Sequence, residues 1–154
     1  MRRLAGAALG LALALPAHSE WVFADFESVS GAAQKKLFPH LESAGRGILA
    51  ASGDQLAVVW ENNRDGSPQV YAALRRIDRP GFAAPLRLSA GREAYEPVVV
   101  GLGAGRFLAA FEQDGRVMAR VFSREEQGTL TVLDSAVSAQ ITLAAGKARL
   151  HAAW

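Results

Sequence analysis

Short apolar runs alternate with short polar breaks along this chain, and residues 56–75, LAVVWENNRDGSPQVYAALR, are the clearest instance. A β-branched and aromatic run ends at Trp60, a polar stretch follows over Asn62–Pro68, and a second apolar run contains Val70 and Tyr71. Two such runs around a turn-rich segment predict a β-hairpin with a long loop.

Similar runs recur along the whole chain and predict short strands. No amphipathic run of ten or more residues with helical periodicity is present, although residues 32–37 could form a short helix that Pro39 would end. The predicted strands are residues 20–29, 47–51, 56–61, 69–75, 85–89, 97–101, 106–112, 116–122, 130–133, 139–144 and 148–154.

The segments LAVVWE, RFLAAFE and RLHAAW hold the same place in three successive units. Their last aromatic residues, Trp60, Phe111 and Trp154, are separated by 51 and 43 residues. A period of this length with about four short strands in each unit is typical of β-propeller blades. We expect the three aromatic side chains to face inward on the second strand of each unit.

The predicted fold is therefore all-β, with antiparallel β-propeller repeats that make about two and a half blades of an incomplete ring. Blade one covers about 37–89, blade two about 90–134, and residues 139–154 begin a third blade. The strand at 20–29 is predicted to be a spare one that would complete a final blade. A compact sandwich or barrel of eight to ten strands is the alternative.

The N-terminal residues 1–19 have the three-part plan of a secretory signal peptide. Arg2 and Arg3 precede twelve apolar residues, which are too few to span a bilayer, and Pro16 is followed by a small-residue cleavage site that ends at Ser19. The predicted protein is exported, to the periplasm or the medium, and has no integral membrane segment after cleavage.

Removal of this segment changes the charge balance. The chain has 17 Lys and Arg residues and 15 Asp and Glu residues, and Arg2 and Arg3 are the only charged residues in 1–19. The mature chain is then formally neutral, which does not favour nucleic acid as a partner.

Few residues suit catalysis or metal binding. The chain has no cysteine, and its two mature histidines, His40 and His151, lie far apart in the sequence. Sequence patterns for a nucleophile elbow, a P-loop or a zinc protease helix are absent. We expect no cofactor and no metal, and we expect His151 to be a partly exposed strand residue.

The segment VVWENNRDGSPQVYAALRRID resembles the repeated strand-turn-strand unit of exported bacterial β-propellers, both the sialidase-like (BNR-type) group and the TolB-like, WD40-related group. The resemblance covers roughly residues 37–154. It depends on the pair Trp60-Glu61, the turn 64–66 and Val70-Tyr71, and the second unit keeps Phe111-Glu112 and the turn 114–115.

The sialidase-like resemblance would imply an arginine cluster, a Tyr/Glu nucleophile pair and an acid/base Asp. The expected arginine is absent from residues 38–41, FPHL, and no S-x-D-x-G-x-T-W box occurs. Tyr95 and Glu96 are adjacent and could serve as the pair. Alternatively, Tyr95 packs and Glu96 begins the strand before Pro97.

The long turn supplies the other candidate site residues. Arg64 and Asp65 could form part of a ligand-binding loop, because loops at strand ends commonly carry function. Alternatively, Asp65 accepts backbone N–H groups and Gly66 adopts a positive φ in a self-contained turn. The oxygens of Asn62, Asn63 and Asp65 could also bind Ca²⁺, although the spacing lacks the regular D-x-D-x-D pattern.

The sequence leads to two main functional hypotheses, beside a third that the TolB-like resemblance implies, a scaffold in envelope assembly. The first is an exported, non-catalytic propeller module that binds a protein or glycan partner through a loop face that includes Arg64, Asp65, Tyr95 and Glu96. The alternative is a fragment of a sialidase-like glycoside hydrolase whose catalytic residues lie mostly outside this chain. Large aromatic residues such as Trp60 could stack on sugars, or they could pack between blades.

Overall fold

The computed structural model describes Val29 and residues 48–135, 140–146 and 148–154. The predicted signal peptide, the predicted strand at 20–29 apart from Val29, and the residues 32–41 discussed above lie outside this part of the chain. All the regular structure within the described residues consists of antiparallel β-strands, as the alternation predicted.

Two four-stranded sheets follow each other along the chain, each with its strands in sequence order, and a two-stranded hairpin comes after them. The first sheet contains β1 (Ile48–Ser52), β2 (Gln55–Asn62), β3 (Gln69–Arg76) and β4 (Leu86–Arg87). The second sheet contains β5 (Ala94–Gly103), β6 (Arg106–Gln113), β7 (Arg116–Phe122) and β8 (Thr131–Asp134). The C-terminal hairpin contains β9 (Thr142–Ala145) and β10 (Leu150–Ala153).

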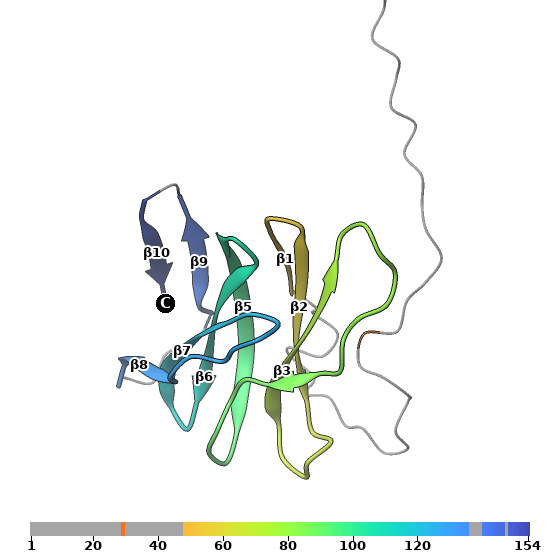
Figure 1. Ribbon diagram of the computed structural model, residues 1–154. Helices are drawn as coiled ribbons and strands as arrows, with labels where there is room; N and C mark the ends of the chain where they lie inside the picture. Colours follow the sequence, from red (N-terminus) through yellow and green to blue (C-terminus); the bar gives the residue numbers. More distant parts are fainter. Residues whose placement is uncertain (1–28, 30–47, 136–139, 147) are drawn as a thin grey trace, which may run out of the picture.

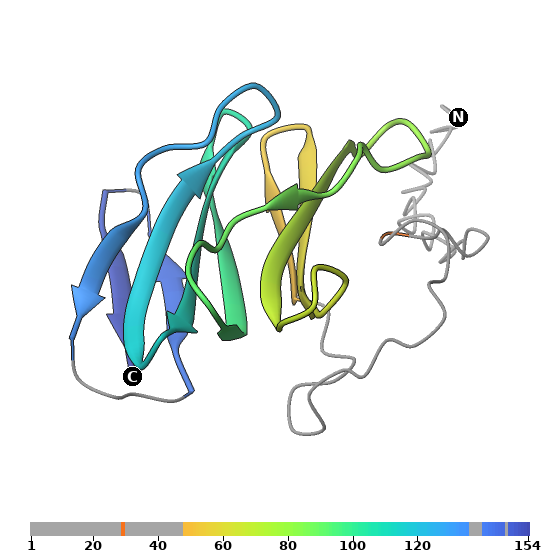
Figure 2. The same cartoon turned by 90° about the horizontal axis from the view of Figure 1, so that it is seen from below.

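The second sheet lies between the first sheet and the C-terminal hairpin (Figures 1 and 2). The first strands of the two sheets and of the hairpin lie next to one another, since β5 contacts β1 on one side and β9 on the other. No sheet closes on itself, so the described strands do not form the alternative barrel.

Two apolar clusters fill the spaces between these layers. The larger one joins Ala57 and Val59 of the first sheet to Phe107 and Phe111 of the second. The smaller one lies on the opposite face of the second sheet. It joins Leu108 and Ala110 of β6 to Ile141, which precedes β9, and to Leu143 within β9. Both faces of the second sheet are therefore buried, which explains why five consecutive residues of β6, Phe107 to Phe111, are inaccessible or nearly so.

The register confirms that Trp60 and Phe111 occupy equivalent strand positions. Gln55 pairs with Ser52 across the β1–β2 turn, Arg106 pairs with Gly103 across the β5–β6 turn, and each aromatic residue follows five positions later. Trp154 follows Arg149 by the same number of residues, just beyond β10.

The expected inward orientation holds fully for only one of these residues. Phe111 is completely buried, whereas Trp60 is half-buried and Trp154 is 46% exposed. The reason is the layer order: Phe111 faces the first sheet, but no described sheet lies against the Trp60 side of β2. Trp154 lies on the side of the hairpin that faces the second sheet, where its Nε1 donates to Asp134 Oδ2 of β8 at 2.8 Å, but at the edge of the sheet it stays partly exposed.

One strand begins earlier than the sequence predicted. We expected a strand from Pro97, but β5 starts at Ala94, which pairs with Gln113. A register shift between Tyr95 and Val98 accommodates Glu96, whose φ is 50°. Such a bulge tolerates a proline that cannot donate a ladder hydrogen bond.

Candidate ligand-binding surface

The connections at one end of the sheets form a continuous set that we call the loop-end surface (lower end in Figure 1). It consists of the β2–β3 loop (63–68), the β4–β5 crossover (88–93) and the β6–β7 turn (114–115), together with the adjoining strand ends. The four residues singled out in the sequence, Arg64, Asp65, Tyr95 and Glu96, all lie at this end. They belong to two different groups of side chains.

The first group surrounds the ring of Tyr71 on β3. Its hydroxyl donates a hydrogen bond to Asp65 Oδ2 at 2.5 Å, and Arg87 Nη1 on β4 lies 3.6 Å from the same oxygen. The guanidinium carbon of Arg64 lies 4.8 Å from the ring centroid, within the range of a cation–π contact. The ring of Trp60 stacks against Tyr71 with centroids 6.2 Å apart.

These contacts explain the acid–base behaviour of Tyr71. Burial, the hydrogen bond to Asp65 and the negative charge of that carboxylate raise the pKa of Tyr71 to about 12, against the opposing influence of Arg87 and Arg64. The phenol therefore stays protonated and acts as a fixed donor that orients Asp65. Aromatic, cationic and anionic side chains are thus held together around the ring of Tyr71.

The turn itself is built differently from the self-contained alternative. Asn62 Oδ1, not Asp65, accepts the backbone N–H of Arg64 at 2.8 Å, while Gly66 N donates to Asn63 O at 3.0 Å. Gly66 has the expected positive φ, 94°. Because Asn62 caps the turn, the Asp65 carboxylate is left to bond Tyr71, and the Asn62 oxygen is already engaged by the backbone rather than available to Ca²⁺.

The β4–β5 crossover is anchored to the first sheet by a buried amide. Gln69, which is fully buried, donates from Nε2 to Arg92 O at 2.8 Å and to Ser67 Oγ at 3.0 Å. Its Oε1 accepts from Ser89 Oγ at 2.7 Å, and that hydroxyl also accepts from Val70 N at 3.0 Å. One side chain therefore ties both neighbouring loops to β3.

The second sheet anchors the same crossover from the other side. Gln113 Oε1 accepts from Ala90 N at 2.7 Å, and Asp114 Oδ1 accepts from the backbone N–H groups of Arg92 and Glu93 at 3.2 and 3.3 Å. The Arg92 side chain itself is 91% exposed. The crossover is therefore a rigid support that presents a charged group to solvent.

Tyr95 belongs to the second group, which is acidic. Burial, a hydrogen bond with Glu93 and the negative charges of Glu93, Glu61 and Glu112 raise the pKa of Tyr95 to about 12. Burial and the charge of Glu96 also raise the pKa of Glu112, the cross-strand partner of Tyr95. These shifts make the phenol harder to ionise, the opposite of what an attacking tyrosinate needs.

Glu96 has a bridging role. Its Oε2 accepts the backbone N–H of Gln140 at 2.9 Å, which connects the bulge of β5 to the segment before β9. The adjacency of Tyr95 and Glu96 in the sequence therefore does not make them a pair: Tyr95 hydrogen-bonds Glu93, whereas Glu96 contacts the neighbouring unit.

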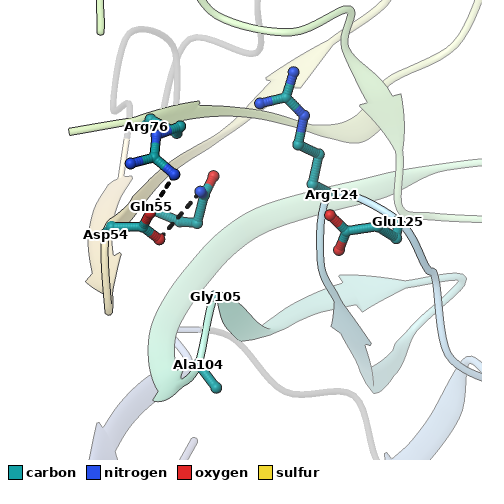
Figure 3. Close-up of a pocket in the computed structure, with 7 residues that line it drawn as sticks. All are labelled: Asp54, Gln55, Arg76, Ala104, Gly105, Arg124 and Glu125. Atoms are coloured by element: carbon teal, nitrogen blue, oxygen red, sulfur yellow. Dashed lines mark hydrogen bonds and ion pairs between the residues drawn. The ribbon is translucent and has the colours of Figure 1, made fainter. Parts of the chain in front are cut away.

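A polar depression of about 250 Å³ lies at the opposite end of the sheets (Figure 3). Arg76 and Asp54 form an ion pair on one side of it, at 2.6 Å, and Arg76 also binds Asp78 through two hydrogen bonds. Arg124 and Glu125 line the other side. The positive charge of Arg76 is already compensated, so this depression has less to offer a charged ligand than the loop-end surface.

Sequence reasoning found Arg64 and Asp65 but missed the part played by Arg87 and Gln69. Arg87 joins the group because β4 pairs with β3, which places it directly across from Tyr71. No local sequence pattern predicts that β4 pairs with β3 in this register. Within the described residues, no group of three or more His, Cys, Asp or Glu side chains is arranged to hold a metal ion, and no helix has the length and hydropathy to cross a membrane.

The chain matches no protein-family model, no curated protein and no solved structure. The loop-end surface and the chemistry of its side chains are therefore the basis for inferring a function.

Proposed function

We propose that this protein is an exported, non-catalytic β-propeller module that binds a protein or glycan partner through its loop-end surface. The architecture is supported by two successive four-stranded meanders that pack face to face, with equivalent residues at equivalent register positions. The export half of the proposal is supported by the sequence plan of residues 1–19.

The observation that carries the binding role is that the Asp65 carboxylate and the backbone of the segment that carries Arg92 are held in place before a ligand arrives. Asp65 is held by Tyr71 and Arg87, and Arg92 is presented by a crossover that Gln69 and Asp114 anchor. Side chains that are ordered before binding lose little conformational entropy when a ligand arrives. Neighbouring cationic, anionic and aromatic groups suit a polar ligand with acidic and hydroxyl functions.

Binding can be tested with the purified protein on an array of acidic and neutral glycans and in a pull-down from a periplasmic extract. We expect a retained ligand whose binding falls at least tenfold in an Arg64→Ala/Arg92→Ala double variant. The matched control is Arg106→Ala/Arg124→Ala, which removes two exposed positive charges at the opposite end and should bind as the unmodified protein does. Equal losses in both double variants, or no retained ligand, would contradict the proposal.

A second candidate is a fragment of a sialidase-like glycoside hydrolase. The observation in its favour is that Tyr95 is hydrogen-bonded to Glu93 and lies close to further glutamates. The elevated pKa of Tyr95 argues against a nucleophilic role, so we favour the binding module. Turnover of a fluorogenic sialoside that disappears in Tyr95→Phe would reverse this preference.

A further inference from the structure

The two outermost faces of the layered sheets differ in a systematic way. On the first sheet, β1 and β2 turn Leu49, Leu56, Val58 and Trp60 away from the second sheet, since Leu49 pairs with Val58 and both alternate with core residues. We call these four residues the large-residue strip. Leu49 is 59% exposed and the other three are half-buried.

The C-terminal hairpin exposes a face of mostly small residues to solvent. Leu143 packs on the second sheet, so the alternate residues of the hairpin point away from it. Three of these four residues are small and one is a histidine, and all are exposed: Thr142, Ala144, His151 and Ala153. We call them the small-residue face.

The internal interface between the two sheets joins the same two kinds of face. Phe107 and Phe111 of β6 pack on Ala57 and Val59 of β2. By position after the turn, Leu56 and Trp60 are the equivalents of Phe107 and Phe111, and His151 and Ala153 are the equivalents of Ala57 and Val59. The large-residue strip and the small-residue face are therefore the two halves of an interface of the type already present inside the molecule.

On the same side of the first sheet, the β3 residues Tyr71 and Ala73 are already buried, at 4% and 0% exposure. The four residues of the large-residue strip therefore all lie on β1 and β2.

We propose that the small-residue face of one copy of this chain docks on the large-residue strip of a second copy, in a head-to-tail arrangement that continues the internal order of sheets. Such a heterologous contact uses two different surfaces and leaves one of each for the next copy, so it produces a ring where the rotation closes. The association buries Leu49 and Trp60, and because Trp60 also stacks on Tyr71, the large-residue strip borders the Tyr71 group of the loop-end surface.

The test is the molar mass of the purified full chain by light scattering over a range of concentrations. We expect a mass that is a multiple of one chain. Leu49→Glu damages only the strip, and Ala153→Arg damages only the small-residue face, so each variant should have the mass of a single chain. The control Ile77→Glu adds the same charge at a residue that is 51% exposed but lies beyond the end of β3, and it should leave the mass unchanged.

Mixing the two monomeric variants distinguishes a head-to-tail contact from other kinds of association. The intact small-residue face of Leu49→Glu can dock on the intact strip of Ala153→Arg, so the mixture should form a dimer and nothing larger. A single-chain mass for the unmodified protein at every concentration would overturn the proposal. So would association that survives Leu49→Glu, or that is lost in Leu49→Glu but not in Ala153→Arg. Circular dichroism checks that each variant is folded.

Discussion

Gly101 of β5 lies against the carbonyl oxygen of Ala51 in β1, so close that a methyl group at position 101 would overlap with that oxygen. The two residues belong to adjacent sheets and are fifty positions apart in the chain. Glycine at this position lets the first strands of the two sheets approach each other, and the clusters on either side of β6 can then form.

Gly101→Ala should therefore destabilise the fold. The methyl group meets backbone rather than a flexible side chain, so we expect a loss of about 1–3 kcal/mol in the free energy of unfolding. Gly146→Ala is the control, because the nearest atom there is 3.7 Å away, an ordinary contact. Urea unfolding of both variants measures the difference, and an equal small change in the two would mean that the sheets are not held this closely.

Gln69→Leu tests the anchoring of the crossover. The substitution removes the partner of the Ser89 hydroxyl and of the Arg92 carbonyl, and an unpaired buried polar group costs about 1–3 kcal/mol. Gln127→Leu, at an exposed glutamine that accepts from Arg120, should change the unfolding free energy by less than about 0.5 kcal/mol. The Val70 N–H donates to the Ser89 hydroxyl that Gln69 holds, so its hydrogen exchange should become faster in Gln69→Leu and not in Gln127→Leu.

Phe111 and Trp60 should differ in their contribution to stability despite their equivalent positions. Phe111→Ala removes a fully buried ring and should cost about 3–5 kcal/mol, whereas Trp60→Ala removes a half-buried one and should cost roughly 1–2 kcal/mol. Thermal or urea unfolding compares them in the single-chain Leu49→Glu background, where no second copy covers Trp60. A cost for Trp60 as large as that for Phe111 in this background would contradict its half-buried position.

The two tyrosines of the chain, Tyr71 and Tyr95, allow a direct titration. In a Tyr95→Phe background, the tyrosinate absorbance should report Tyr71 alone, with a midpoint at about 12 rather than the ordinary value of about 10. Asp65→Asn should lower this midpoint, because it removes the acceptor's negative charge. Asp114→Asn is the control and should leave the midpoint unchanged, because Asp114 does not contact Tyr71. A shift of the same size in both variants would contradict the role of Asp65 in raising the pKa of Tyr71.

The same shift determines how stability depends on alkaline pH. The unfolded chain loses the phenolic proton at about pH 10 and the folded chain only at about pH 12, so the native state binds more protons between these values. Stability should therefore be undiminished below about pH 10 and should fall as the pH rises toward 12. The fall should be smaller in Tyr71→Phe.

The sequence alone determined the secondary structure and the order of the units. Alternation of apolar and polar residues and the turn residues are local signals, so they predicted the strands at 56–61, 69–75, 106–112 and 116–122 to within one or two residues. The repeat of LAVVWE and RFLAAFE likewise placed Trp60 and Phe111 at equivalent positions. Tertiary structure decided which of these residues is buried, because burial requires a neighbouring sheet, and only Phe111 faces one among the described residues. It also brought Arg87 to Tyr71 and separated Tyr95 from Glu96, since strand pairing and a bulge depend on contacts between distant residues that no local pattern contains.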